Sequence, residues 1–182
     1  MRLELNTLYH AKLKDMSFGV IPKDVLIDIV SSGRICGVLL ETEIAYRFEG
    51  VVSRGQGKGP DLIDDRLGTI QAKTYHHSQH EGIYTRGMSK GLPKSQSKKI
   101  FTTKSGLWDS LKRRKSLGEN VEEQIESYFD DYDKFCYIDI SKMKNLEFSF
   151  IVVSSEMPKN NHCDGNISLD DIMNSVEKEV SI

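Results

Sequence analysis

The stretch that decides the fold runs from Asp61 to Tyr75 and reads Asp-Leu-Ile-Asp-Asp-Arg-Leu-Gly-Thr-Ile-Gln-Ala-Lys-Thr-Tyr. Two apolar residues precede a turn sequence at 64–68, and polar and apolar residues then alternate, which is the pattern of a β-hairpin. Successive side chains of a strand point to opposite faces, so Thr69, Gln71 and Lys73 share one face of the second strand. Two polar groups, those of Gln71 and Lys73, are therefore predicted to project together from its centre.

Outward from this hairpin, helical and extended patterns alternate along the chain. We expect helices over Pro22–Ser32, Arg34–Glu49, Gly106–Lys115, Glu119–Tyr132 and Leu169–Lys178, the last behind Ser168 as N-cap, and further strands over Phe135–Ile140 and Leu146–Ser154. Residues 50–60 are expected to form a polar loop or a frayed strand, and residues 76–105 a long loop. This order predicts an α/β fold with a central mixed β-sheet flanked by helices, as a single domain over residues 1–182.

Composition limits the class of protein. Apolar residues make up 38% of the 182 residues and charged residues 29%, which suits one folded domain. We find neither a signal peptide nor a long apolar run, so we expect a cytoplasmic protein of prokaryotic type with no membrane contact. The three cysteines show no CxxC spacing and are expected to be reduced and structural.

Charge is unevenly distributed along the chain although the net charge is only −2. Residues 86–115 contain ten Lys or Arg and one acid, whereas residues 119–133 contain seven acids and no base. The basic segment favours contact with phosphates. The acidic helix should face away from a DNA duplex, toward solvent or a partner protein.

A motif spans the hairpin: Gly59-Pro60-Asp61, then nine residues, then Gln71-Ala72-Lys73. At these positions the sequence resembles the PD-(D/E)xK nuclease superfamily, whose members include type II restriction endonucleases, mismatch-repair nickases and junction resolvases. The resemblance implies a restriction-endonuclease-like fold, with the Asp and the acid-x-Lys on adjacent strands. It also implies Mg²⁺-dependent hydrolysis of DNA, with Mn²⁺ as a substitute.

The resemblance assigns roles to the residues of the motif. Asp61, the side-chain oxygen of Gln71 and the backbone carbonyl of Ala72 are implied to be the metal ligands, because Mg²⁺ prefers oxygen donors. Lys73 is implied to orient the attacking water and to stabilise the charge that builds on the phosphate.

This chain departs from the family pattern because Gln71 stands where the usual residue is an acid. The metal site loses one negative charge, which a carboxylate from the preceding helix would offset. We expect Glu43 to supply it, with Glu41 and Glu49 as alternatives.

The residues after the hairpin are candidates for binding DNA. The predicted phosphate contacts are Lys90, Lys94, Lys98, Lys99 and Lys104, together with His76 and His77. The histidines could also be part of a metal cluster with His80 and Glu81, but a solvated loop near a phosphate backbone accounts for them better.

The size of the chain bears on its partners. One catalytic core cuts one strand, so we expect double-stranded DNA to be cut by a homodimer or by this chain beside a larger DNA-recognising subunit. The size resembles that of the small cleavage subunits of heterodimeric restriction enzymes from restriction-modification systems. Two alternatives stay open: a repair or junction nuclease of the same fold, and a DNA- or partner-binding module without catalysis.

Overall fold

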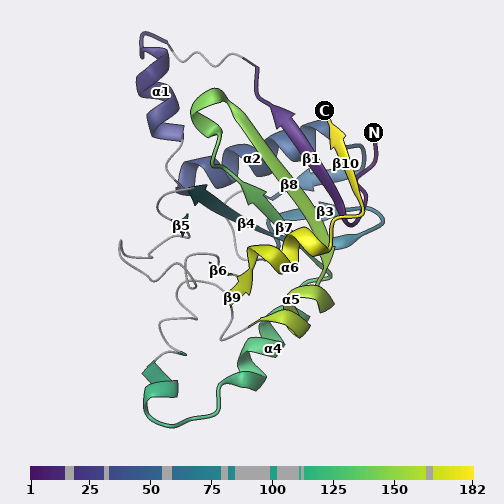
Figure 1. Cartoon of the computed structure of the whole chain (residues 1–182). Coiled ribbons are helices and arrows are strands. Elements are labelled where there is room, and N and C mark those ends of the chain that lie inside the picture. Colours follow the sequence, from purple (N-terminus) through teal and green to yellow (C-terminus); the bar gives the residue numbers. More distant parts are fainter. Residues whose placement is uncertain are drawn as a thin grey trace.

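The computed structural model describes residues 1–14, 19–30, 33–54, 59–78, 82–84, 99–101, 111, 113–162 and 166–182. These residues form a mixed α/β structure built on one strongly curled sheet (Figure 1). The curled sheet contains the strands β1 (Thr7–Lys12), β2 (Val51–Ser53), β3 (Leu62–Asp64), β4 (Gly68–Ser78), β5 (Gly82–Tyr84), β7 (Lys134–Asp139), β8 (Glu147–Ser154) and β10 (Lys178–Ser181). A separate pair consists of β6 (Lys99–Phe101) and β9 (Asn166–Ser168).

The strand order is β10-β1-β8-β7-β4-β3-β2, and β5 pairs with the far end of β4. The pairs β1–β10 and β4–β7 are parallel and the other pairs are antiparallel. The sheet is therefore mixed, as predicted. The parallel pair β4–β7 places β4, the second strand of the candidate hairpin, inside the sheet, between the buried β7 and the short β3.

Helices pack against both faces of the sheet. The helices are α1 (Lys23–Val30), α2 (Gly33–Arg47), α4 (Glu122–Asp130), α5 (Glu156–Asn161) and α6 (Leu169–Asn174), with a short 3-10 turn at Met143–Asn145. Leu40 and Ile44 of α2 pack with Ile70 and Ala72 of β4 on one face. On the other face α4 and α6 form a second apolar cluster with β7 and β8 (Figure 1).

Most predicted elements are present near their expected bounds. The two N-terminal helices correspond to α1 and α2, the hairpin to β3 and β4, and the two later strands to β7 and β8. The acidic helix is shorter than expected and begins at Glu122. The side chain of Ser168 accepts a hydrogen bond from Asp171 N at 3.0 Å, which confirms the predicted N-cap.

Other predictions were wrong in part. The long loop predicted from His76 is not a loop at its start, because β4 continues to Ser78 and pairs with β5. The last helix ends at Asn174 rather than at Lys178, where β10 begins. The short strand β2 agrees with the frayed strand that was one of the two expectations for residues 50–60, whereas β1 was not predicted. Of the helix expected at 106–115, only Leu111 and residues 113–115 lie within the described residues, and these are helical.

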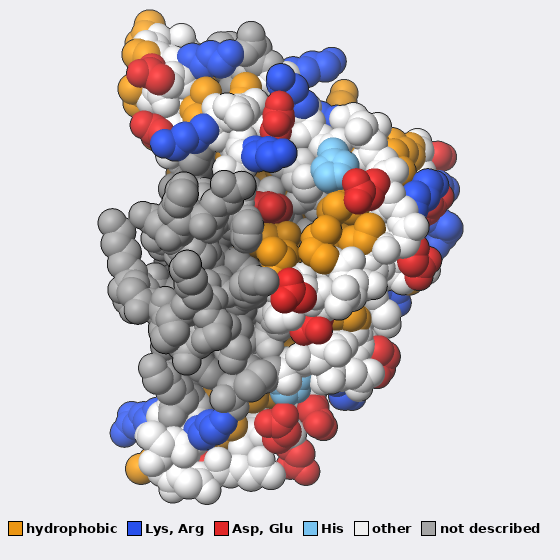
Figure 2. Space-filling view, viewed as in Figure 1, with side chains coloured by type: hydrophobic (Ala, Val, Ile, Leu, Met, Phe, Trp, Pro, Cys, Tyr) orange, Lys and Arg blue, Asp and Glu red, His pale blue; other side chains and the backbone are white. Residues whose placement is uncertain are grey.

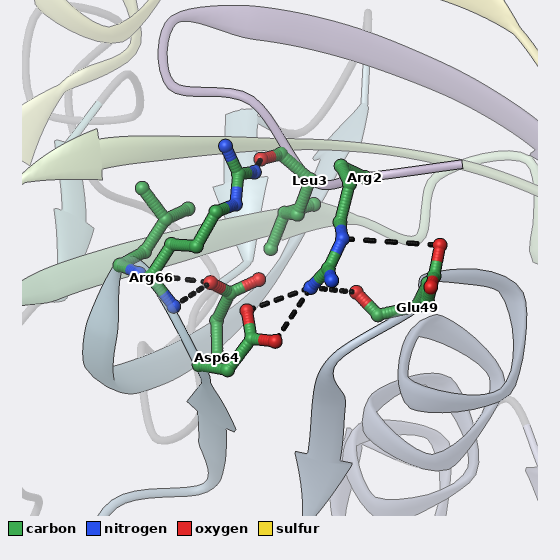
Figure 3. A network of polar contacts seen from close by, with 7 residues as sticks. Arg2, Leu3, Glu49, Asp64 and Arg66 are labelled. Atoms are coloured by element: carbon green, nitrogen blue, oxygen red, sulfur yellow. Dashed lines mark hydrogen bonds and ion pairs between the residues drawn. The ribbon is translucent and has the colours of Figure 1, made fainter.

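Two arginines link the N-terminal segment to the turn of the hairpin through hydrogen bonds and an ion pair (Figure 3). Arg2 Nη1 lies 2.7 Å from the carboxylate of Asp65 and 3.1 Å from the backbone oxygen of Glu49. Arg66 Nη2 donates to the backbone oxygen of Leu3 at 2.7 Å. These contacts hold the turn between β3 and β4, and with it the two strands that carry the candidate site.

Candidate functional site

Asp61 stands where the pairing between β3 and β4 stops. Its own N–H donates to Ile70 O at 3.1 Å, and the preceding residue, Pro60, has no N–H with which to extend the ladder. The next amide on that edge of β4, Ala72 N, donates instead to Asp61 Oδ2 at 2.8 Å. The sequence Pro-Asp therefore ends the ladder and places a carboxylate on the open edge of β4.

The side chain of Gln71 meets the same carboxylate. Its Nε2 donates to Asp61 Oδ2 and lies 3.4 Å from the backbone oxygen of Ala72. Two oxygens that the motif assigns to metal binding thus converge on a single donor nitrogen. Gln71 is only 6% exposed, and its Oε1 is buried with no hydrogen-bond partner among the described residues.

Glu41 reaches the site from α2. It is 7% exposed, and its Oε2 is buried without a hydrogen-bond partner in the described part of the chain. Burial, and then the negative charge of Asp61, raise the pKa of Glu41 to about 7, while the Lys73 ammonium acts in the opposite direction. These influences place Glu41 within electrostatic reach of both Asp61 and Lys73.

Of the three upstream acids considered, Glu41 is the one with a pKa that both Asp61 and Lys73 influence. Glu43 Oε1 lies 2.7 Å from Arg47 on the same helix, in a pair of the i,i+4 type. Glu49 is exposed beyond the end of α2 and lies 3.8 Å from Arg2. The two glutamates are thus occupied elsewhere, and α2 directs Glu41 toward the hairpin.

Lys73 lies on the face of the sheet that α4 covers. Its Nζ stands over the ring of Tyr128, 5.4 Å from the ring centroid, which is within the range of a cation–π contact. Burial raises the pKa of Tyr128, and the charge of Asp61 adds to this effect. No pattern in the sequence indicates Tyr128, because its position next to Lys73 depends on how α4 packs on the sheet.

The donors present suit a hard divalent cation. Asp61 and Glu41 supply two carboxylates, and Gln71 and Ala72 supply neutral oxygens, which is the donor type that Mg²⁺ prefers. The buried atoms Glu41 Oε2 and Gln71 Oε1 lack partners, a condition that a bound cation would relieve. Within the described residues, no group of three or more His, Cys, Asp or Glu is placed to hold a metal ion. Position 71 adds no carboxylate to such a group, because it is a glutamine.

The predicted DNA contacts cannot be placed in the same way. Lys90, Lys94, Lys98 and Lys104 lie outside the described residues, as do His80 and Glu81. The backbones of His76 and His77 belong to β4 and that of Lys99 to β6, but the structure does not describe these three side chains. Cys36 and Cys136 are buried free thiols, as expected, whereas Cys163 lies outside the described part.

The acidic helix exposes its charges. Glu122, Glu123 and Glu126 of α4 are exposed, while Ile125 and Phe129 are buried against the sheet. Figure 2 shows acidic side chains gathered over the lower part of the molecule, where α4 lies. The acids thus point outward while the opposite side of the same helix contributes Tyr128 to the site.

Comparisons with known proteins returned no match among protein-family models, curated proteins or solved structures. No helix within the described residues is long and apolar enough to span a membrane. The interpretation of the site therefore depends on the residues themselves.

Proposed function

We propose that this chain is a metal-dependent DNA endonuclease of the PD-(D/E)xK type, with a restriction-endonuclease-like fold. The observation that carries the proposal is the meeting of Asp61 and Gln71 at the edge of β4, with a buried carboxylate, Glu41, that the charges of both Asp61 and Lys73 influence. The order of α2, the β3–β4 hairpin and a parallel β7 supports the fold assignment, because the family core places the Asp and the x-Lys motif on adjacent strands.

Each residue has a role in hydrolysis of a phosphodiester bond. Asp61, Glu41, the Gln71 side chain and the Ala72 carbonyl would hold Mg²⁺, which neutralises charge on the phosphate when bound. Lys73 orients the attacking water and stabilises negative charge that develops on the phosphate oxygens. Burial of Gln71 and Glu41 limits solvent at the site and strengthens these charge interactions.

The substrate and partners follow from charge and size. The Lys/Arg-rich segment at 86–115 supports binding to double-stranded DNA. One site cuts one strand, so we infer that a homodimer or a larger DNA-recognising subunit completes the cleavage of a duplex. A repair or junction nuclease of the same fold is the second candidate, because it would use the same four residues; preference for branched or mismatched DNA over plain duplex separates the two.

The test is nicking of supercoiled plasmid in Mg²⁺ or Mn²⁺, with the wild type beside Asp61→Ala, Lys73→Ala and Glu41→Gln. We expect metal-dependent nicking in the wild type and its loss in the first two variants. Glu43→Gln is the matched control, since Glu43 lies on the same helix but pairs with Arg47, and it should cleave like the wild type.

Two outcomes would contradict the proposal. One is cleavage that persists in Asp61→Ala and Lys73→Ala. The other is a DNA affinity that is the same with and without Mg²⁺ and the same in the wild type and Asp61→Ala, with no cleavage by the wild type even when lysate from the source cell is added. The second outcome would favour a binding module without catalysis.

A further inference from the structure

Tyr128, on α4, contacts Lys73 from outside the hairpin. Its ring is almost fully buried, with 4% exposure, and lies below the Lys73 ammonium at 5.4 Å from Nζ to the ring centroid. Lysine is otherwise a flexible four-carbon chain with many rotamers, so a fixed ring beneath its ammonium restricts where the charge can lie.

The ring of Tyr128 is itself held in place. It makes edge or tilted contacts with Phe129, Tyr132 and Phe135, with ring centroids 5.9, 5.6 and 6.1 Å apart. Phe135 belongs to β7, the strand that pairs with β4 in parallel, so these contacts tie the helix to the strand beside Lys73. The platform under the ammonium is therefore a packed aromatic cluster rather than a single mobile side chain.

The hydroxyl of Tyr128 has no such contact. Its oxygen is buried and has no hydrogen-bond partner among the described residues. A buried hydroxyl without a partner contributes nothing favourable to packing, so the ring is the part of Tyr128 that acts on Lys73. This distinction separates a role for the ring from a role for the hydroxyl.

We propose that Tyr128 is a positioning residue whose ring holds the Lys73 ammonium in place at the candidate site through a cation–π contact. The inference rests on the proposed nuclease function for its catalytic consequence, but the contact itself does not. It makes the docking of α4 on the sheet a condition for a correctly oriented lysine, because the lysine comes from β4 and its platform from α4.

The contact is tested first by a measurement that does not depend on DNA cleavage. Protons above an aromatic ring are shielded, so the ε-CH₂ protons of Lys73 should resonate upfield of ordinary lysines in ¹³C-edited NMR spectra, with Lys73→Ala identifying the signal. The shift should persist in Tyr128→Phe and vanish in Tyr128→Met, which fills space without a ring. An unshifted Lys73 signal in the wild type overturns the proposal.

The catalytic consequence is tested by single-turnover nicking of plasmid. We expect the rate to fall about three- to tenfold in Tyr128→Met with DNA affinity unchanged, and to stay within about twofold in Tyr128→Phe. Equal losses in Tyr128→Phe and Tyr128→Met would overturn the role of the ring. A shielded Lys73 in a wild type that never cleaves DNA would instead overturn the nuclease function and leave the contact established.

Discussion

Replacing Glu41 by Gln should stabilise the protein at alkaline pH, although it removes a residue of the candidate site. Glu41 is buried, and its pKa is raised from the ordinary 4.5 to about 7. In that interval the folded chain binds more protons than the unfolded chain, so the free energy of unfolding falls as pH rises from 4.5 to 7. The decrease in the free energy of unfolding is complete only well above pH 7, where Glu41 is ionised in both states.

The magnitude follows from the change in pKa. Each unit of difference between the pKa of the folded state and that of the unfolded state corresponds to about 1.4 kcal/mol. Ionised Glu41 therefore lowers the free energy of unfolding by up to about 3 kcal/mol. Domains of this size are stable by roughly 5–15 kcal/mol, so the effect should be readily measured. Gln has nearly the same shape as Glu and carries no charge, and it therefore removes the pH-dependent loss while the packing is kept.

The assay is urea unfolding of wild type and Glu41→Gln at pH 4.5 and pH 8, with the difference between the two proteins taken at each pH. Titration of the groups that do not interact with Glu41 cancels in this difference. Glu43→Gln is the control from the same helix, and it should change the free energy of unfolding by less than about 1 kcal/mol at either pH, because Glu43 and Arg47 form a pair near the surface. A Glu41→Gln effect that is the same at both pH values, within about 0.5 kcal/mol, would refute the reasoning.

Two further predictions concern the hairpin. Gln71→Glu restores the acid of the family pattern beside Asp61 and should lower the Mg²⁺ concentration needed for half-maximal nicking by about tenfold, through added charge at the metal; an unchanged requirement would mean that Gln71 does not face the metal. Gly68→Ala should destabilise the protein by more than about 2 kcal/mol in urea unfolding, because Gly68 has φ +81° and an added Cβ would collide with the Asp133 carboxylate. Gly118→Ala is its control, since Gly118 also has φ +81° but nothing within 4 Å of an added Cβ, and equal losses in the two variants would contradict the role of the collision.

Local patterns in the sequence predicted the elements that carry the motif. The hairpin from Asp61 was predictable because alternation, the turn residues and Gly68 all act within a few residues. β10 was not predictable, because Lys178–Ser181 is short and polar and pairs in parallel with β1, near the opposite end of the chain. Its place depends on long-range contacts such as the bond from Glu177 N to Asn6 O at 2.8 Å.

The upstream acid shows the limit of sequence reasoning at the site. On an α-helix, residues two apart lie about 200° apart around the axis, so Glu41 and Glu43 flank the same apolar stripe of Leu40 and Ile44 on opposite sides. Periodicity gives no reason to prefer one flank. The choice is made by the direction in which α2 crosses the sheet, which only the packing of Leu40 and Ile44 against β4 determines.

The Gln at position 71 changes what the site depends on. With an acid there, two carboxylates would come from a single hairpin and would be held together by its backbone ladder. In this chain the second carboxylate, Glu41, comes from a helix on one face of the sheet, while Lys73 contacts a tyrosine from a helix on the other face. The charge and orientation of the candidate site therefore depend on the packing of α2 and α4 on both sides of β4. In such a site, an isolated hairpin or a loosely packed intermediate contains the motif but not the arrangement that the proposed hydrolysis needs.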